Sequence, residues 1–269
     1  GQHLDNFVTQ AAAGNVKLAA SHLADIETQG FQNSVVNLSQ GVDALNLMDM
    51  VKMALGPGSK FTTEQQHQYN SNLRSALLNP SEQSTATEKL LDQRLLQRVS
   101  ALLKESPEVR GAVEQWRQGV QSFESAGHNS VVVASGNSGK AFRALVKEGF
   151  ELDGSEDSNL LAVPEVMTVG ATSVTSNGDL GLMQTSFGAE VDVLASGDHE
   201  GRFGTSYASP KVANALRAAH LLHPDFTSEQ AEGWLKENLA ASVEVLEQPV
   251  ALLNTGRAAA LLQALERDQ

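Results

Sequence analysis

A serine stands at the start of an expected helix. Residues 204–210 read Gly-Thr-Ser-Tyr-Ala-Ser-Pro, and an apolar pattern with helical spacing follows them as far as Leu222. A serine at a helix start exposes its hydroxyl, and its backbone N–H lacks a partner within the helix, so the two groups can attack a carbonyl and stabilise the resulting oxyanion. Ser206 is therefore a candidate nucleophile; the alternative is that it only caps the helix. Pro210 is expected in the first turn, where its missing N–H costs nothing.

An asparagine follows a second apolar segment. Residues 131–139 read Val-Val-Val-Ala-Ser-Gly-Asn-Ser-Gly, which predicts a strand ending in a glycine-rich turn. A side-chain amide at the carboxyl end of a strand can donate a hydrogen bond to an oxyanion, an interaction typically worth ~10²–10³ in rate. Asn137 is a candidate for that role, and the alternative is that it only tolerates a left-handed turn conformation.

The elements that must position these two residues alternate between helix and strand. Such alternation predicts an α/β fold, in which a mostly parallel sheet is covered by helices on both faces in three layers. In these sheets the chemistry lies beyond the carboxyl ends of the strands. The expected strands are 34–38, 130–134, 166–169 and 191–194, and the expected helices are 3–27 (one helix or two), 108–126, 140 onward, 206–222 and 256–267.

Residues 42–107 interrupt this alternation with a stretch that is rich in Gln, Ser, Glu and Leu. We expect a helical insertion here. Thr62 or Thr63 can cap a helix that runs to about Leu78, and the leucines of 90–103 form an amphipathic stripe. The stripe is expected to pack the insertion on the body of the domain; the alternative is a lid or a docking surface for a regulator.

Composition narrows the function. The 269 residues fit one domain, and 19 Lys and Arg against 32 Asp and Glu give a net charge of −13, which disfavours nucleic acid and anionic membranes as partners. Cysteine is absent, which excludes disulfides and thiolate nucleophiles. No apolar run reaches the length of a membrane span. Secreted and cytoplasmic locations both stay open.

Five motifs occur in an order that resembles the subtilisin-like serine protease family. The string Gly-Thr-Ser-x-Ala-x-Pro is that family's nucleophile signature. The resemblance covers about 33–238 apart from the insertion, and it implies a subtilisin-like fold and a serine endopeptidase. The motifs lie at 35–41 (Val-Val-Asn-Leu-Ser-Gln-Gly), 133–139, 164–171 (Pro-Glu-Val-Met-Thr-Val-Gly-Ala), 186–197 (with Ser-Phe-Gly and Val-Asp-Val-Leu-Ala-Ser-Gly) and 204–210.

This resemblance implies roles for particular residues. Ser206 would be the nucleophile and Asn137 the oxyanion-hole amide. The segments Ser39-Gln40-Gly41 and Ala134-Ser135-Gly136 would flank an extended substrate peptide and wall its primary specificity pocket. Glycine and small residues suit the close backbone approach that strand addition requires. Walls this small would leave room for a sizeable apolar side chain.

The chain departs from the family's pattern in one respect. The family's catalytic Asp and His stand upstream of the strand that matches 35–38, and neither of their motifs is found here. The resemblance therefore implies that both lie on a preceding segment, which could be a separate N-terminal fragment. Stand-ins within the chain are His3 beside Asp5 and His199 beside Asp198. The alternative function is a catalytically inactive pseudoprotease that binds a peptide or protein partner.

No cofactor is required for this chemistry. Loop carbonyls after Gly170 could hold a calcium ion, as in some relatives, and no clustered ligands suggest zinc. The remaining histidines, most of which fall in helical patterns or in the insertion, are expected to be surface or packing residues: His22, His67, His128, His220 and His223.

Overall fold

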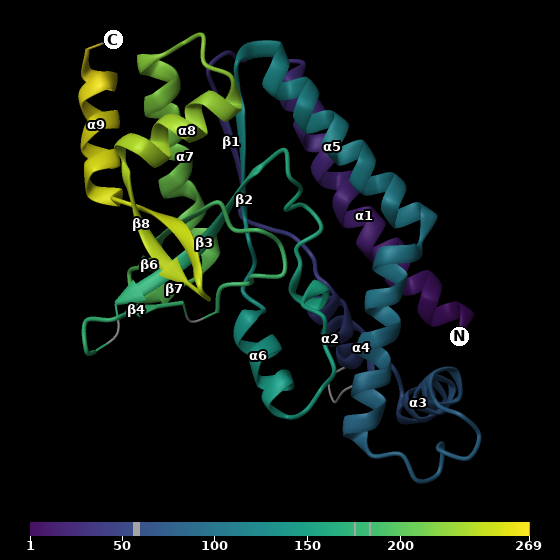
Figure 1. Ribbon diagram of the computed structural model, residues 1–269. Coiled ribbons are helices and arrows are strands. Elements are labelled where there is room, and N and C mark those ends of the chain that lie inside the picture. Colours follow the sequence, from purple (N-terminus) through teal and green to yellow (C-terminus); the bar gives the residue numbers. More distant parts are fainter. Residues whose placement is uncertain (56–59, 175, 183, 269) are drawn as a thin grey trace.

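A mixed, mostly parallel sheet forms the centre of the fold (Figure 1). The computed structural model describes residues 1–55, 60–174, 176–182 and 184–268. The strands are β1 (Val35–Leu38), β2 (Ser130–Ala134), β3 (Met167–Val174), β4 (Leu180–Gly181), β5 (Val193–Ser196), β6 (Asp198–His199), β7 (Arg202–Phe203), β8 (Ala240–Val245) and β9 (Gln248–Leu253). The order is β1-β2-β3-β5-β9-β8; β8 and β4 are antiparallel to their neighbours β9 and β3, and the other pairs are parallel. β6 and β7 form a separate hairpin.

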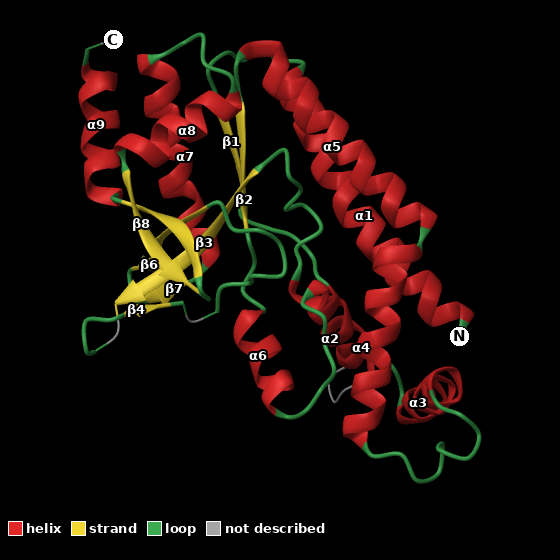
Figure 2. Cartoon of the chain, viewed as in Figure 1, coloured by secondary structure: helices red, strands yellow, loops and turns green. Residues whose placement is uncertain are grey.

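Helices pack against both faces of the sheet (Figure 2). They are α1 (Gln2–Glu27), α2 (Ala44–Leu55), α3 (Thr63–Leu77), α4 (Glu88–Glu105), α5 (Pro107–Gly127), α6 (Gly139–Lys147), α7 (Thr205–Leu222), α8 (Ser228–Asn238) and α9 (Thr255–Arg267), with a 3₁₀ turn η1 (Ser155–Asp157). Val131 and Val133 of β2 pack among residues of α1, α4 and α5, whereas Val132 packs on the side of α7, α8 and α9. Because successive residues of a strand point to opposite faces, the sheet has a core on each side. The expected α/β class is confirmed.

Most of the expected elements are confirmed. β3 continues to Val174 rather than ending at Val169, and the chain after α7 adds α8 and the β8–β9 hairpin, which had not been expected. The segment 34–38, expected to be a buried strand, lies at the edge of the sheet, and its residues are only partly buried. Its outer edge therefore has no neighbouring strand among the described residues.

Helices occupy most of the described part of 42–107, as expected. Thr62 caps α3, and its side chain and that of Gln65 each accept a hydrogen bond from the other residue's backbone N–H. The leucine stripe of α4 is buried against the body of the domain, with Leu95, Leu96 and Val99 almost fully inaccessible. This burial supports the packing interpretation of the stripe over a docking surface.

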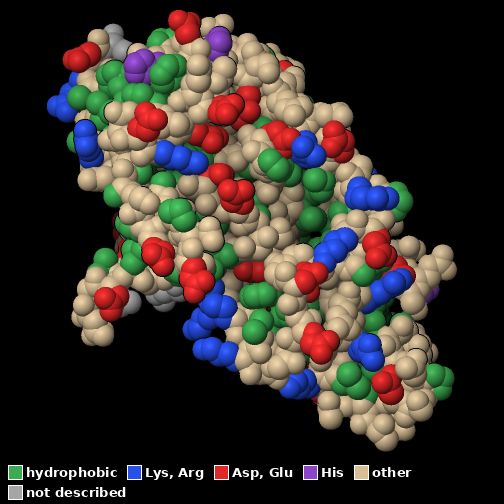
Figure 3. Space-filling view, in the orientation of Figure 1, with side chains coloured by type: hydrophobic (Ala, Val, Ile, Leu, Met, Phe, Trp, Pro, Cys, Tyr) green, Lys and Arg blue, Asp and Glu red, His purple; other side chains and the backbone are tan. Residues whose placement is uncertain are grey.

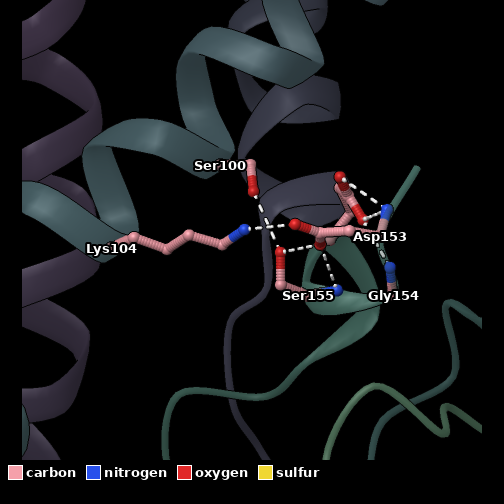
Figure 4. A network of polar contacts seen from close by, with 6 residues as sticks. Ser100, Lys104, Asp153, Gly154 and Ser155 are labelled. Atoms are coloured by element: carbon pink, nitrogen blue, oxygen red, sulfur yellow. Dashed lines mark hydrogen bonds and ion pairs between the residues drawn. The ribbon is translucent and has the colours of Figure 1, made fainter. Parts of the chain in front are cut away.

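A polar network ties α4 to the loop that enters η1 (Figure 4). Lys104 Nζ lies 2.6 Å from Asp153 Oδ2, and the hydroxyls of Ser100 and Ser155 are 3.2 Å apart. Asp153 Oδ1 accepts a hydrogen bond from the backbone N–H of Ser155. The hydrogen bonds from Lys104 and then Ser155 hold the pKa of Asp153 well below its usual range. The network fixes the turn that carries Asp157 toward the carboxyl ends of the strands.

Charged side chains of both signs are interspersed over the face shown in Figure 3, and basic side chains gather over α6. The residues of α6 that carry this charge are Lys140, Arg143 and Lys147. The negative net charge therefore does not form one continuous acidic patch on this face. None of the helices among the described residues combines the length and hydropathy needed to cross a bilayer.

Two partly buried carboxylates, Glu232 and Glu124, lie near the amino ends of the strands, away from Ser206. Burial, and then the nearby charge of Asp192, raises the pKa of Glu232 to about 8. Burial likewise raises the pKa of Glu124 to about 7. A carboxyl whose folded pKa exceeds its unfolded value stabilises the fold at low pH, and that contribution is lost as the pH rises from about 4.5 toward the folded pKa.

We therefore expect Glu232→Gln to stabilise the protein at alkaline pH. At pH 9 the folded protein must ionise Glu232 in a partly buried site, so removing the carboxyl should raise the free energy of unfolding by about 1–2 kcal/mol. At pH 4 the two proteins should unfold at nearly the same temperature. Thermal unfolding from pH 4 to 9 tests this, with Glu237→Gln, an exposed change on the same helix, as the control. Equal stabilisation at both pH values would contradict the burial argument.

Candidate functional site

Ser206 lies where the start of α7 meets the carboxyl end of β1. It is the second residue of α7, so its backbone N–H has no partner within the helix. Its hydroxyl is partly exposed and donates a hydrogen bond to the backbone carbonyl of Ser39, at 3.0 Å. Ser39 directly follows β1, as expected for a polar group at the carboxyl end of a strand. The structure thus brings together two residues that are 167 positions apart.

Asn137 lies against the start of α7, where Thr205, the residue before Ser206, orients its side-chain amide. Its Oδ1 accepts hydrogen bonds from the backbone N–H of Thr205, at 2.9 Å, and from the Thr205 hydroxyl, at 3.1 Å. Because two donors flank Oδ1, the amide orientation follows from the hydrogen-bond network. The side-chain NH₂ group is left to donate elsewhere, and Asn137 is exposed. The structure thus places the Asn137 side chain against Thr205, the residue directly before Ser206.

The glycine-rich turn that carries Asn137 is held by the segment 185–187. The backbone N–H of Ser138 donates to Ser186 Oγ at 3.0 Å, and the backbone N–H of Ser186 donates to the carbonyl of Gly136 at 3.0 Å. Asp157 Oδ2 accepts the backbone N–H of Phe187 at 3.0 Å. Gly136 has φ +111°, a conformation that favours glycine. Two hydrogen bonds with Ser186 therefore hold the turn that carries Asn137, and Asp157 anchors the adjacent Phe187.

Pro210 does not lie where it was expected. It is the sixth residue of α7, within the second turn, so its missing N–H leaves the carbonyl of Ser206 without the usual intrahelical bond. The hydroxyl of Ser39 donates to that carbonyl at 3.3 Å instead. Ser39 therefore contacts the start of α7 through both its carbonyl and its hydroxyl. The proline costs one helical hydrogen bond, and Ser39 replaces it.

A cavity of about 430 Å³ opens beside Asn137 and Thr205. One wall is formed by Ser39, Gln40 and Gly41, and the other includes Ala134 and Gly136. These are the two segments that were expected from the sequence to form the walls of a specificity pocket. Ser135 lies between the latter two residues but does not line the cavity, because alternate side chains of an extended segment point to opposite sides; its hydroxyl is buried.

Asn159 joins the two walls, and the sequence analysis did not identify it. Its Nδ2 donates to the carbonyl of Ala134 at 2.9 Å, and its Oδ1 accepts the backbone N–H of Leu161 at 3.0 Å. Its side chain also lies directly against Gly41, where a Cβ atom would come within 2.1 Å of Oδ1. No local motif marks Asn159, because its role depends on the approach of three separate segments.

We expect Gly41→Ala to destabilise the protein by about 1–3 kcal/mol, since the added methyl overlaps a buried, doubly hydrogen-bonded side chain. Chemical denaturation measures the loss. Gly14→Ala, on α1 with no atom within 4 Å of the added Cβ, is the matched control and should be neutral or slightly stabilising. Equal effects of the two changes would contradict the close contact between Gly41 and Asn159.

Asp43, at the floor of the cavity, is a second residue that the sequence analysis did not identify. It precedes α2, and its Oδ1 accepts the backbone N–H of Asn46 at 2.8 Å, while Asn46 Oδ1 accepts the backbone N–H of Asp43. The side chain is 2% exposed. Burial, partly offset by hydrogen bonds from Asn46 and Ser138, raises the pKa of Asp43 to about 6. An aspartate directly before a helix can be predicted from the sequence as a helix cap. Its position under the cavity cannot be predicted in this way.

The expected histidine stand-ins lie in different places. His3 is in α1, not in a loop, and lines a separate cavity with residues of α3, while Asp5 pairs with Arg98. His199 lies in the β6–β7 hairpin just before α7, where its ring stacks on that of Tyr207 with centroids 5.4 Å apart. His3 therefore lies in a different cavity from the one that Thr205 lines, whereas His199 contacts Tyr207, the residue after Ser206, with no hydrogen bond to Ser206 among those described.

A further histidine, His22, lies closer to the site than the sequence suggested. It projects from α1 into a groove of about 430 Å³ along β1, which Asn37, Ser39 and Gln40 also line. Asn37 Nδ2 donates to the hydroxyl of Ser39 at 3.0 Å, but its buried Oδ1 has no hydrogen-bond partner among the described residues. This buried acceptor lacks the hydrogen bond that would offset its desolvation.

The calcium expectation is not supported at Gly170. The residues that follow it belong to β3 and pair in register with β5 through Thr172 and Ser196, so they do not form a loop with free carbonyls. Among the described residues no group of three or more acidic or histidine side chains is arranged to hold a metal ion. His128 lies at the amino end of β2, and His220 is buried on the Ser130 hydroxyl, both distant from Ser206 along the strand direction.

Comparison with known proteins gives no match to this chain, whether against protein-family models or against curated proteins.

Proposed function

We propose that the chain is the nucleophile-bearing part of a subtilisin-like serine endopeptidase. The observation that carries the proposal is the Thr205–Asn137 pair: its hydrogen bonds fix the Asn137 amide beside Ser206 with the NH₂ group free to donate. In this reaction Ser206 Oγ attacks the scissile carbonyl, and the Ser206 N–H and Asn137 Nδ2 stabilise the oxyanion that forms. The intermediate then collapses, the peptide C–N bond breaks, and the amine leaves with the proton that the general base took from Ser206; water hydrolyses the acyl-enzyme and frees Ser206.

A general base must take the proton of Ser206, because serine is a weak nucleophile at its own pKa. We propose that the base comes from a segment that packs along β1. Support for this comes from the open edge of β1, its partly buried apolar side chains and the unsatisfied Asn37 Oδ1 in the adjacent groove. Parallel strands are normally covered on both faces and paired, so an open edge of this kind favours an added strand. The base then reaches the face of Ser206 that is still accessible.

The same site also supports a second function, a pseudoprotease that binds a peptide without cleaving it. The observation that favours it is the hydrogen bond from Ser206 Oγ to the carbonyl of Ser39, which uses the hydroxyl proton, and none of the described histidines accepts that proton. The cavity and both of its walls would serve such a peptide equally well. The two functions differ only in whether a general base accepts the proton of the Ser206 hydroxyl.

Labelling with a fluorophosphonate tests the proposal, because the probe reacts with an activated serine. We expect the complete protein, with any segment that precedes Gly1, to be labelled and Ser206→Ala to stay unlabelled. Labelling of the 269-residue chain alone would mean that a base lies within it, and His199→Ala and His22→Ala would then identify which. A complete protein that is folded but unlabelled would favour the pseudoprotease.

A further inference from the structure

We propose that the cavity beside Ser206 binds the cationic side chain of a lysine or arginine in the substrate. The carbonyl that Ser206 attacks belongs to that same residue. The inference rests on the proposed endopeptidase function, and it names the substrate class of that same site. The small walls of the cavity favoured an apolar side chain in the sequence analysis, but the floor that the structure adds changes the chemistry.

The lining of the cavity is part polar and part apolar, and its charged residues are all of one sign. Asp43 lies at its floor and Asp49 is exposed further along α2, and no Lys, Arg or His is among the described residues that line it. Amide groups of Asn46 and Asn159 complete the polar floor. A guanidinium or ammonium group entering the cavity would therefore approach the carboxylates of Asp43 and Asp49 without meeting a competing cation among the lining residues.

The Asp43 carboxylate lies beside two helix starts, which favour its ionised form, although burial raises its pKa. It caps α2 itself, and its side chain is hydrogen-bonded to Ser138, the residue that precedes α6. The amino ends of both helices place partial positive charge beside it. With a pKa near 6 it is largely charged at neutral pH despite its burial. Hydrogen bonds satisfy its oxygens but supply no compensating cation.

A second buried carboxylate lies behind Asp43 and raises the local negative potential. Asp157 is 3% exposed, and its Oδ1 has no hydrogen-bond partner among the described residues. Its charge acts on Asp43 strongly enough to oppose ionisation there. Arg143 offsets part of the Asp157 charge, but it does not line the cavity. A cation in the cavity would relieve the repulsion between the two aspartates.

The walls and the floor match the two parts of a lysine or arginine side chain. The methylene groups would pass along Gly136 and Ala141, where the lining residues are small, with Asn159 closing the space between Gly41 and Ala134. The charged end would then reach Asp43 and Asp49. A purely apolar side chain would instead desolvate the carboxylates without pairing them, which is costly.

Binding of p-aminobenzamidine to the 269-residue chain tests the proposal without any need for turnover. We expect a fluorescence titration at neutral pH to show saturable binding, with benzamidine competing at least tenfold better than benzamide, its neutral analogue. The double variant Asp43→Asn, Asp49→Asn should weaken p-aminobenzamidine at least tenfold. Asparagine is as good a helix cap as aspartate, so this variant should keep its fold, which circular dichroism checks. Asp225→Asn, an exposed change elsewhere, should bind normally.

Two results would overturn the inference: equal competition by benzamide and benzamidine, or an unchanged affinity in the folded double variant. Peptide cleavage by the complete protein distinguishes the inference from the proposed function. Cleavage that depends on Ser206 but follows apolar residues would refute the cationic preference and keep the endopeptidase. Cation binding that is lost in the double variant, in a complete protein that neither labels nor cleaves, would refute the endopeptidase and keep the cationic pocket.

Discussion

Ser206→Ala is expected to abolish peptide hydrolysis by the complete protein while leaving its unfolding temperature almost unchanged. Nucleophile, base and orienting group act as a unit in serine proteases, so removing the nucleophile costs on the order of 10⁶ in kcat. The hydroxyl is partly exposed and makes one hydrogen bond, to the carbonyl of Ser39, so its loss removes little from the core. Hydrolysis of a peptide with a fluorogenic leaving group measures the effect.

The matched control is Ser122→Ala, which removes an exposed hydroxyl on α5 that hydrogen-bonds Glu27 far from the site. Its turnover should equal that of the unchanged protein. Peptide affinity should survive Ser206→Ala, since the cavity and both walls are intact in that variant. Residual hydrolysis by Ser206→Ala within tenfold of the unchanged protein would show that another group carries the reaction.

The relation between Ser206 and Asn137 was predictable from sequence because each residue is specified locally. A glycine-rich turn after an apolar strand marks Asn137, and the start of a helix marks Ser206. In a parallel sheet, groups that follow carboxyl ends of neighbouring strands meet at one edge. The spacing of 68 residues between Asn137 and Thr205 hides this relation in the sequence, and the hydrogen bonds from Thr205 to Asn137 Oδ1 show it in the structure.

The floor of the cavity was not predictable because it depends on contacts between distant segments. Asn159 lies in an irregular segment and acts only where that segment meets Gly41 and Ala134. Asp43 is readable as a helix cap, and nothing in the local pattern says that the cap would lie under a cavity. The pocket walls are local features of the sequence, whereas its chemical character is a tertiary one.

The β8–β9 hairpin was missed for a local reason. Its turn residues are Leu246 and Glu247, which have φ values of +49° and +63°. Turns of this kind normally carry Asn and Gly, because most side chains are strained at positive φ. The usual hairpin signal was therefore absent, although β9 pairs with β5 and extends the central sheet. Tertiary pairing with β5 offsets the unfavourable turn.

Asn137→Leu is expected to lower kcat by roughly 10²–10³ with little change in KM, because an oxyanion donor acts on the transition state and not on the bound peptide. The substitution also removes the acceptor for the Thr205 N–H, so some loss of stability should accompany it. Steady-state kinetics across a range of peptide concentrations separates kcat from KM. Thermal unfolding measures the structural part of the effect.

Asn137→Asp separates the two roles of the amide. An aspartate keeps an oxygen for both hydrogen bonds from Thr205, so the turn should stay in place, but it has no NH₂ group and brings a negative charge toward the oxyanion. We expect its kcat to fall at least as far as that of Asn137→Leu, with a smaller loss of stability. If Asn137→Asp retained full kcat, or if both variants raised KM and left kcat unchanged, Asn137 would serve the turn and peptide binding and not the chemical step.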